Sequence, residues 1–319
     1  MLEALVEVKN LYKRFGPITA VDDVSFRLNQ GEVLGFLGPN GAGKTTTMRI
    51  ITGFIIPDTG SVILGGDDIA HAPVVAKRRI GYLPEGAPLY SDMTSAGFLG
   101  FIAEIRGFRG KEKEYRIADT IEKIHLQSVL NQSIGTLSKG FKRRLGLAQA
   151  ILHDPEILVL DEPTDGLDPN QKHEVRTLIQ EMAAEKAIIL STHILEEVDS
   201  VCTRAIVISA GRLVGDSIPA KLRTRSHWHN AVTLLVRSDD GKDIHERLAD
   251  LSDIQSVELV SETDGLVRLV LYAKNKKPIA ATINQIAREQ DWKVEGLYVE
   301  QGRLDDVFRT MTTGETALT

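Results

Sequence analysis

Cysteine is almost absent from this sequence, since Cys202 is the only one among 319 residues. A single thiol cannot form an intrachain disulfide, which suits a reducing compartment. Long apolar runs are also missing, because none approaches the ~18–20 residues that a transmembrane helix needs. The first ten residues, MLEALVEVKN, are acidic where a signal peptide has a basic start. We therefore expect that any membrane location depends on another polypeptide.

The sequence also lacks an excess of basic residues. Its net charge of -6 argues against a nucleic-acid-binding surface, which is basic, so we expect no nucleic-acid partner. The 42% hydrophobic and 26% charged residues are ordinary values for a globular protein. The length is sufficient for two domains.

A glycine-rich stretch, GPNGAGKTT, occupies residues 38–46. It follows the apolar run 33–37 and precedes a helical pattern, and strand–loop–helix is the setting in which G-x-x-x-x-G-K-[ST] binds phosphate. Gly41 and Gly43 can adopt backbone angles that turn successive N–H groups toward one anion. The N-terminus of the following helix adds partial positive charge. The sequence therefore predicts a nucleotide site.

Side chains of the same loop have predicted roles. We expect Lys44 to contact the β- and γ-phosphates and the Thr45 hydroxyl to bind Mg²⁺. The other loop residues predicted to hold the nucleotide are Gly38, Pro39, Asn40, Gly41, Ala42, Gly43 and Thr46.

Residues 3–37 alternate between apolar and polar positions in a way that predicts β-strands joined by turns. Tyr12 is predicted to lie in the first connection, within LYKRFG. An isolated tyrosine most often serves packing, but an aromatic ring can also stack on a base. The nearby phosphate loop favours a contact with adenine.

Two short apolar runs, 157–160 and 187–190, are typical of strands buried in a parallel sheet. The first ends in Asp161 and Glu162, and the second is followed by Ser-Thr and then His193. Functional groups gather at the carboxyl ends of such strands. We expect these three side chains to face the phosphate loop.

Residues 92–152 have a helical pattern. Phe98, Phe101, Ile102 and Ile105 recur at i, i+3, i+4 and i+7, the spacing of one buried helix face. Such residues are predicted to form helical core rather than a ligand site.

The region after residue 220 begins with a basic, irregular segment, 221–230, which is predicted to be a linker. His227 and His229 in it have no third metal ligand nearby in the sequence, which favours a solvated linker over a metal site. From residue 231 the order of predicted elements is β-α-β-β-α-β, that of a small ferredoxin-like domain. This region contains no catalytic motif, and we expect a structural or dimerisation module.

The stretch LSKGF at 137–141 completes a set of motifs in one order, and with it residues 3–220 resemble the ATP-binding subunits of ABC transporters. The matching segments are 38–46 for Walker A, 137–141 for the signature, 157–162 for Walker B, Gly166-Leu167-Asp168 for the D-loop, His193 for the switch histidine, and Tyr12 for the adenine-stacking position.

The resemblance implies an α/β P-loop NTPase fold of the ABC type, with a RecA-like core, an antiparallel β subdomain and a helical subdomain at about 86–152. The implied organisation is an ATP-binding domain at 1–220, a linker at 221–230 and a ferredoxin-like domain at 231–319. The implied reaction is ATP hydrolysis with Mg²⁺. Asp161 would hold the metal, Glu162 would be the general base, and His193 would contact the γ-phosphate.

In this family the signature acts on ATP held by the opposite subunit, so Ser138, Gly140 and Asp168 are predicted to complete a site across a homodimer. The partner would be an integral membrane permease, which places the chain at the cytoplasmic face of the inner cell membrane. A glutamate at position 85 and the ferredoxin-like tail resemble the exporter branch, which includes the gliding-motility and multidrug types.

Two departures from the family pattern affect the predicted site. Lys139 and Phe141 replace a glycine and a glutamine of the usual LSGGQ signature, whereas Ser138 and Gly140 remain able to cap a helix and approach a phosphate. Glu85 replaces a usual glutamine and is predicted to ligate Mg²⁺. The alternatives to a transport subunit are a soluble ABC ATPase acting on ribosomes or DNA, and a nucleotide-binding scaffold without turnover.

Overall fold

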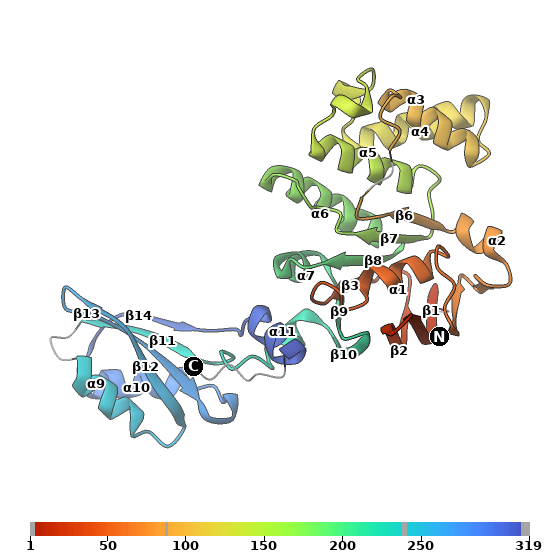
Figure 1. Ribbon diagram of the computed structural model, residues 1–319. Helices are drawn as coiled ribbons and strands as arrows, with labels where there is room; N and C mark the ends of the chain where they lie inside the picture. Colours follow the sequence, from red (N-terminus) through yellow and green to blue (C-terminus); the bar gives the residue numbers. More distant parts are fainter. Residues whose placement is uncertain (1–3, 87–88, 238–240, 314–319) are drawn as a thin grey trace. The chain divides into compact units, whose positions relative to one another are not determined.

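The computed structural model describes residues 4–86, 89–237 and 241–313, which divide after Ile218 into two compact units (Figure 1). The first contains the glycine-rich loop and every residue predicted to bind ATP. Each unit has its own hydrophobic core.

A six-stranded, largely parallel sheet forms the centre of the first unit, in the order β10-β9-β3-β8-β7-β6. Its strands are β3 Val33–Leu37, β6 Ile80–Leu83, β7 Ile157–Asp161, β8 Ala187–Thr192, β9 Arg204–Ser209 and β10 Arg212–Ser217. Strands β3, β7 and β8 are buried along their whole length. For β7 and β8 this confirms the prediction made from their continuous apolar runs. Only β10 runs antiparallel to its neighbour.

A second, antiparallel sheet of the first unit has the order β2-β1-β4-β5. Its strands are β1 Val6–Phe15, β2 Ile18–Leu28, β4 Thr59–Leu64 and β5 Asp67–Asp68. Strand β1 continues through Phe15 before the hairpin turns, so Tyr12 lies inside a strand and not in a connection as predicted. Main-chain pairing of Lys13, Arg14 and Phe15 with β2 overrides the turn signal of LYKRFG.

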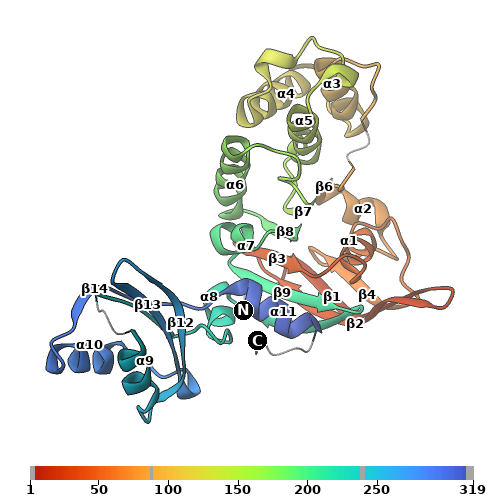
Figure 2. The same ribbon diagram turned by 60° about the vertical axis from the view of Figure 1, so that its left-hand side comes forward.

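Helices surround the central sheet and form a separate group beyond β6 (Figures 1 and 2). Those near the sheet are α1 Lys44–Ile51, α2 Pro73–Arg78, α6 Pro169–Ala183 and α7 Leu195–Val201. The group beyond β6 contains α3 Ser95–Ile105, α4 Gly110–Ile124 and α5 Lys139–Ile151, with the short 3₁₀ turns η1 Gln127–Val129 and η2 Ile134–Thr136. This arrangement matches the predicted helical subdomain.

The predicted buried face of the first helix in that group is partly wrong. Phe98 is 1% exposed, as expected, but Ile105 is 64% exposed and Phe101 is also exposed. Helix α3 packs against α4 and α5 through Phe98, Leu99 and Ala103, a narrower stripe than the periodicity indicated. Ile102 is partly buried, and Phe101 and Ile105 are left on the surface.

The second unit contains a four-stranded antiparallel sheet in the order β12-β13-β11-β14, built from elements in the predicted order β-α-β-β-α-β. Its elements are α8 Pro219–Arg223, β11 Val232–Arg237, α9 Gly241–Ala249, β12 Ile254–Thr263, β13 Leu266–Ala273, η3 Lys274–Lys276, α10 Ala280–Glu289, β14 Lys293–Val299 and α11 Leu304–Thr313. The strand order and the two packed helices are those of a ferredoxin-like domain.

The segment 221–230 is not an extended linker. It lies within the second unit, where α8 packs against α11. Asp306 of α11 accepts hydrogen bonds from the Ser226 hydroxyl and the His227 N–H, and its carboxylate is 2.8 Å from His227 Nδ1. These contacts hold the segment against α11, and sequence composition does not predict them. In the part of the chain that the structure describes, no helix is long and apolar enough to span a membrane.

Candidate nucleotide-binding and catalytic site

The glycine-rich loop joins β3 to α1, as predicted. Gly43 has φ +106°, and a Cβ there would lie 2.3 Å from the carbonyl oxygen of Ala20, so only glycine fits. A Cβ on Gly38 would lie 2.6 Å from the carbonyl oxygen of Ile208. The turn is therefore fixed by its close approach to two neighbouring strands.

The N-terminus of α1 is open to an anion. No side chain caps this helix at Gly43, so its first N–H groups have no side-chain acceptor. Gly41, at φ +78°, has no heavy atom within 4 Å of an ideal Cβ and lies beside open space. Unclaimed N–H groups and an open approach fit the phosphates of a nucleotide.

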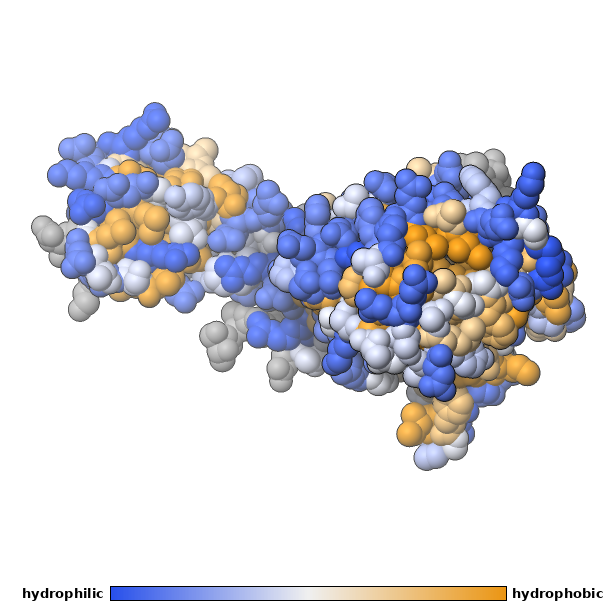
Figure 3. All heavy atoms as spheres, turned by 90° about the horizontal axis from the view of Figure 1, so that it is seen from above, coloured by the Kyte–Doolittle hydropathy of each residue, from blue (hydrophilic) through white to orange (hydrophobic). Residues whose placement is uncertain are grey.

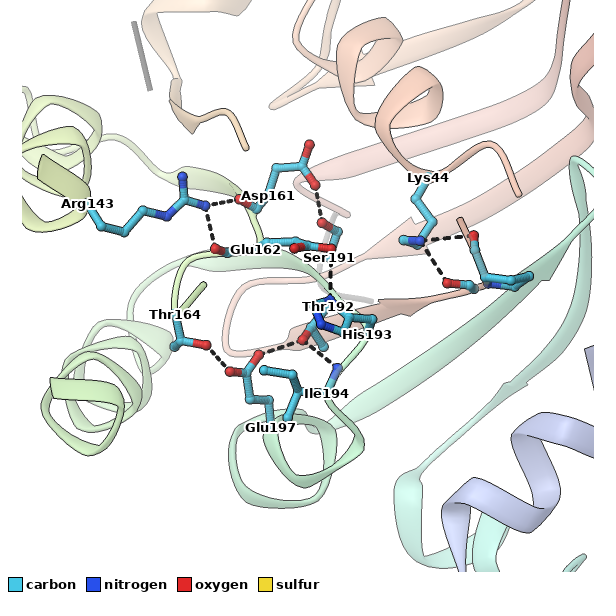
Figure 4. Close-up of polar contacts among 12 residues, drawn as sticks. Lys44, Arg143, Asp161, Glu162, Thr164, Ser191, Thr192, His193, Ile194 and Glu197 are labelled. Atoms are coloured by element: carbon cyan, nitrogen blue, oxygen red, sulfur yellow. Dashed lines mark hydrogen bonds and ion pairs between the residues drawn. The ribbon is translucent and has the colours of Figure 1, made fainter. Parts of the chain in front are cut away.

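Lys44 is buried at the start of α1, and its Nζ donates to the carbonyl oxygens of Gly38, at 2.7 Å, and Pro39, at 3.1 Å (Figure 4). Burial lowers the pKa of Lys44, and the negative charges of Glu162, Asp161 and Glu85 oppose that shift. The lysine thus lies within the electrostatic reach of all three predicted carboxylates, which are distant from it in the sequence.

Asp161 ends β7 and pairs in register with Ser191 of β8, whose hydroxyl donates to Asp161 Oδ1. The other carboxylate oxygen, Oδ2, is buried and has no hydrogen-bond partner among the described residues. Burial raises the pKa of Asp161, while the Ser191 hydrogen bond lowers it. A buried carboxylate oxygen without a donor is a suitable contact for a hard cation or its hydration shell.

Glu162 follows directly and lies beside His193, as predicted from the two strand ends. Glu162 Oε1 is 3.0 Å from His193 Nδ1, and the Glu162 N–H donates to the carbonyl oxygen of Ser191 at 3.0 Å (Figure 4). The backbone of Glu162 has φ +51°, the left-handed region that non-glycine residues rarely occupy. Such strain is concentrated at functional sites.

A buried glutamate binds residues close to Glu162 and His193 in the sequence, and it was not identified from the sequence. Glu197 of α7 is 1% exposed. Its carboxylate accepts hydrogen bonds from the hydroxyls of Thr164, two residues after Glu162, and Thr192, adjacent to His193 (Figure 4). Thr192 Oγ1 in turn accepts from Ile194 N–H at 3.0 Å. No spacing in the sequence connects residues 164, 192 and 197.

The signature and the D-loop both begin helices. Ser138 caps α5 by accepting from Phe141 N–H at 3.3 Å, and Asp168 caps α6 by accepting from Gln171 N–H at 2.9 Å. A Cβ on Gly140 would lie 2.4 Å from Gln171 Oε1, so the glycine permits close packing of the two helix starts. The substituted residue Lys139 lies over Gly166.

Tyr12 and Glu85 are the two predicted site residues at the periphery of the site. Tyr12 Oη is 3.5 Å from Thr19 Oγ1, and the next residue, Ala20, is the one whose carbonyl lies against Gly43. The tyrosine is thus connected to the glycine-rich loop through β2. Glu85 follows β6 with an exposed side chain, and its main-chain carbonyl accepts from Arg143 at 2.8 Å.

Among the described residues, no group of three or more His, Cys, Asp or Glu side chains is placed to hold an ion. Mg²⁺ in nucleotide sites binds phosphates and water with only one or two protein oxygens.

Comparison with known proteins identifies the family of this chain. Residues 21–165 match the family model described as "ABC transporter". The chain is 32% identical over 317 residues to "Nod factor export ATP-binding protein I" of Paraburkholderia xenovorans (strain LB400), covering 99% of both chains. This chain belongs to the ABC transporter family.

Solved structures of ABC transporter subunits show the same fold. One described as "Structure of ATP binding subunit of ABC transporter" has 31% sequence identity and a TM-score of 0.65, covering 69% of this chain and 92% of that one. Another, "Dimeric Structure of MJ0796, a Bacterial ABC Transporter Cassette", has 22% identity and a TM-score of 0.62, covering 67% of this chain and 98% of the other.

As a member of this family, the chain is an ATP-binding subunit and an ATPase that drives transport. These comparisons support the transport role and not the alternative of a soluble ATPase acting on the ribosome.

Proposed function

We propose that this ABC subunit powers an exporter, acting as a homodimer at the cytoplasmic face of the inner membrane and bound there to a membrane-embedded permease. The observation that carries the proposal is the convergence of Glu162, His193 and Asp161 beside an open, uncapped phosphate loop. The relative named for Nod factor export aligns with 99% of this chain, including the ferredoxin-like unit.

The catalytic roles in this proposal follow from contacts. Glu162 takes the proton from the attacking water, and His193, 3.0 Å away, orients the carboxylate and contacts the γ-phosphate. Lys44 exchanges its contacts with main-chain carbonyls for contacts with phosphate oxygens. Bound Mg²⁺ would neutralise charge on the phosphates, and Thr45, Asp161 and Glu85 are the residues that would hold it.

The remaining nucleotide contacts divide between the two copies. Tyr12 and residues 38–46 bind ATP within one copy, with Tyr12 stacked on adenine. Ser138, Gly140 and Asp168 of the second copy close over the γ-phosphate. Supporting this, Ser138 and Asp168 already cap adjacent helices, so two N-termini with partial positive charge lie together.

An apolar surface of the first unit supports attachment to a permease. Phe54 and Ile56 are 72% and 81% exposed, and a pocket of about 250 Å³ adjoins Phe54. The pocket is lined by Thr52, Phe54, Lys77, Ile80, Tyr82, Pro84, Arg106, Gln149 and Ala150. Hydrophobic side chains also gather on the end of this unit that carries α3 and α4 (Figure 3). A cytoplasmic helix with apolar side chains and an acidic residue would match the Phe54 ring and the Lys77 and Arg106 cations.

The experiment is purification of the tagged chain from detergent-solubilised membranes, followed by identification of the associated proteins. A Phe54→Asp variant should lose the co-purifying membrane protein while ATP affinity stays unchanged. Val214→Asp is the matched control, because Val214 is an exposed apolar residue on β10, at the opposite edge of the sheet from β6. Recovery of ribosomal proteins or DNA in place of a membrane protein would refute the export proposal.

A further inference from the structure

Arg143 makes an unusual set of contacts for a buried cation. It lies in α5, five residues after Ser138, and is 7% exposed. Its guanidinium donates to five main-chain carbonyl oxygens, from two segments that are far apart in the sequence. The acceptors are Pro84 and Glu85, each at 2.8 Å, Pro163, at 3.4 Å from Nε, and Asp161 and Glu162.

Two of these carbonyls lie on either side of the Glu162 Cα atom. The carbonyl of Asp161 belongs to the peptide group before the Cα atom of Glu162, and the carbonyl of Glu162 belongs to the peptide group after it. Both accept from the same nitrogen, Arg143 Nη2 (Figure 4). Holding both peptide planes fixes φ and ψ of the residue between them.

That residue needs such support. Glu162 has φ +51°, a left-handed backbone conformation that costs a non-glycine residue free energy. A strained conformation persists only where surrounding contacts determine it. We propose that Arg143 is a positioning residue for ATP hydrolysis, which holds the strained turn so that the Glu162 carboxylate points at the attacking water.

The inference rests on the proposed role of Glu162 as general base. It adds that the position of the base depends on α5 and on residues 84–85. The reason is that Arg143, a residue of α5, contacts both residues 84–85 and the peptide groups on either side of Glu162. Only a guanidinium provides donors in a planar fork wide enough for this; a lysine ammonium acts as a single point. Packing alone would not require a charge here, since burying one costs free energy. Burial lowers the pKa of Arg143, and the negative charges of Asp161, Asp165, Glu162 and Glu85 oppose that shift.

The test measures ATP turnover, KM and thermal midpoint for full-length Arg143→Gln and Arg143→Lys. We expect Arg143→Gln to lower kcat about 10²-fold, the scale of a misplaced catalytic group, with KM unchanged. Arg143→Lys, which keeps the charge but not the fork, should fall between that variant and the wild type.

Arg144→Gln is the matched control. Arg144 is the next residue of α5, is also buried, and forms an ion pair with Glu174 at 2.5 Å. Its loss should lower the thermal midpoint without a selective fall in kcat. The decisive measurement is Arg143→Gln in a Glu162→Gln background, where we expect no further loss of turnover because the group being positioned is already gone.

Each other outcome contradicts the inference. A full additional loss in the Glu162→Gln background would show that Arg143 acts elsewhere. A raised KM with unchanged kcat would make it a binding residue, and failure of both Arg143 variants to fold would make it a structural one. Normal turnover by Glu162→Gln alone would instead refute the proposed catalytic base, which distinguishes the two failures.

Discussion

Glu162 and His193, which are 31 residues apart in the chain, lie with Oε1 and Nδ1 3.0 Å apart. The contact exists because β7 and β8 are parallel neighbours whose carboxyl ends meet at one edge of the sheet. It joins the proposed base to the proposed γ-phosphate sensor. A change at either residue should therefore alter the chemical step more than nucleotide binding.

Replacing Glu162 with glutamine tests the base directly. Glu162→Gln keeps the size of the side chain but removes the proton acceptor, so turnover should fall roughly 10²- to 10⁴-fold. ATP should still bind and should favour a closed dimer, which size-exclusion chromatography with ATP would detect. Hydrolysis at the wild-type rate would contradict the assignment.

Replacing Glu85 tests its predicted contact with the metal. Its carboxylate is a hard oxygen ligand, but its charge disfavours a triphosphate when metal is absent. Glu85→Gln should weaken the dependence of ATP affinity on Mg²⁺ and leave metal-free binding unchanged or tighter. ATP titrations across a range of Mg²⁺ concentrations measure this. Superimposable curves for variant and wild type would place Glu85 away from the metal.

Replacing Glu197 should destabilise the first unit. In Glu197→Ala the buried hydroxyls of Thr164 and Thr192 lose their acceptor, at a cost of about 1–3 kcal/mol for each group left unpaired. Urea denaturation would measure the loss. Glu196→Ala is the control, because the adjacent Glu196 side chain is 86% exposed and its removal should change stability by about 0.5 kcal/mol or less. Equal stability of the two variants would contradict the buried cluster.

His153 should make the first unit sensitive to acid. Burial and then the nearby charge of Arg106 lower its pKa from 6.5 to about 4. Its Nε2 donates to the carbonyl oxygen of Ile80 at 2.9 Å, and Nδ1 is buried without a hydrogen-bond partner among the described residues. A second proton would therefore occupy a site with no acceptor.

The direction of the pH effect follows from that lowered pKa. Above pH 6.5 both the folded and unfolded states have a neutral imidazole, so the stability is fully present. As the pH falls toward about 4, the unfolded state gains a proton that the folded state does not, and stability is lost. His153→Gln, which can keep the Ile80 contact, should flatten this part of the denaturation profile. Parallel profiles for variant and wild type would refute the prediction.

The local sequence determined the elements of this protein and several of its site residues. GPNGAGKTT predicted a phosphate loop because glycine positions and a following helix are local properties, and the structure shows Gly43 at φ +106° beneath α1. The continuous apolar runs of β7 and β8 predicted buried parallel strands because periodicity also depends on nearby residues alone.

Only the tertiary structure decided which side chains support the site. Arg143 contacts carbonyls 18, 19, 58 and 59 residues away, and Thr164 contacts Glu197 33 residues away, so no spacing rule connects them. The same reason explains the wrong predictions. Ile105 has the periodicity of a buried residue, yet its exposure depends on where α4 and α5 pack. The segment 221–230 is held against α11 by hydrogen bonds to the Asp306 carboxylate. The exposure of Ile105 and the fold of residues 221–230 depend on packing partners distant in the sequence, which local sequence patterns and composition cannot predict.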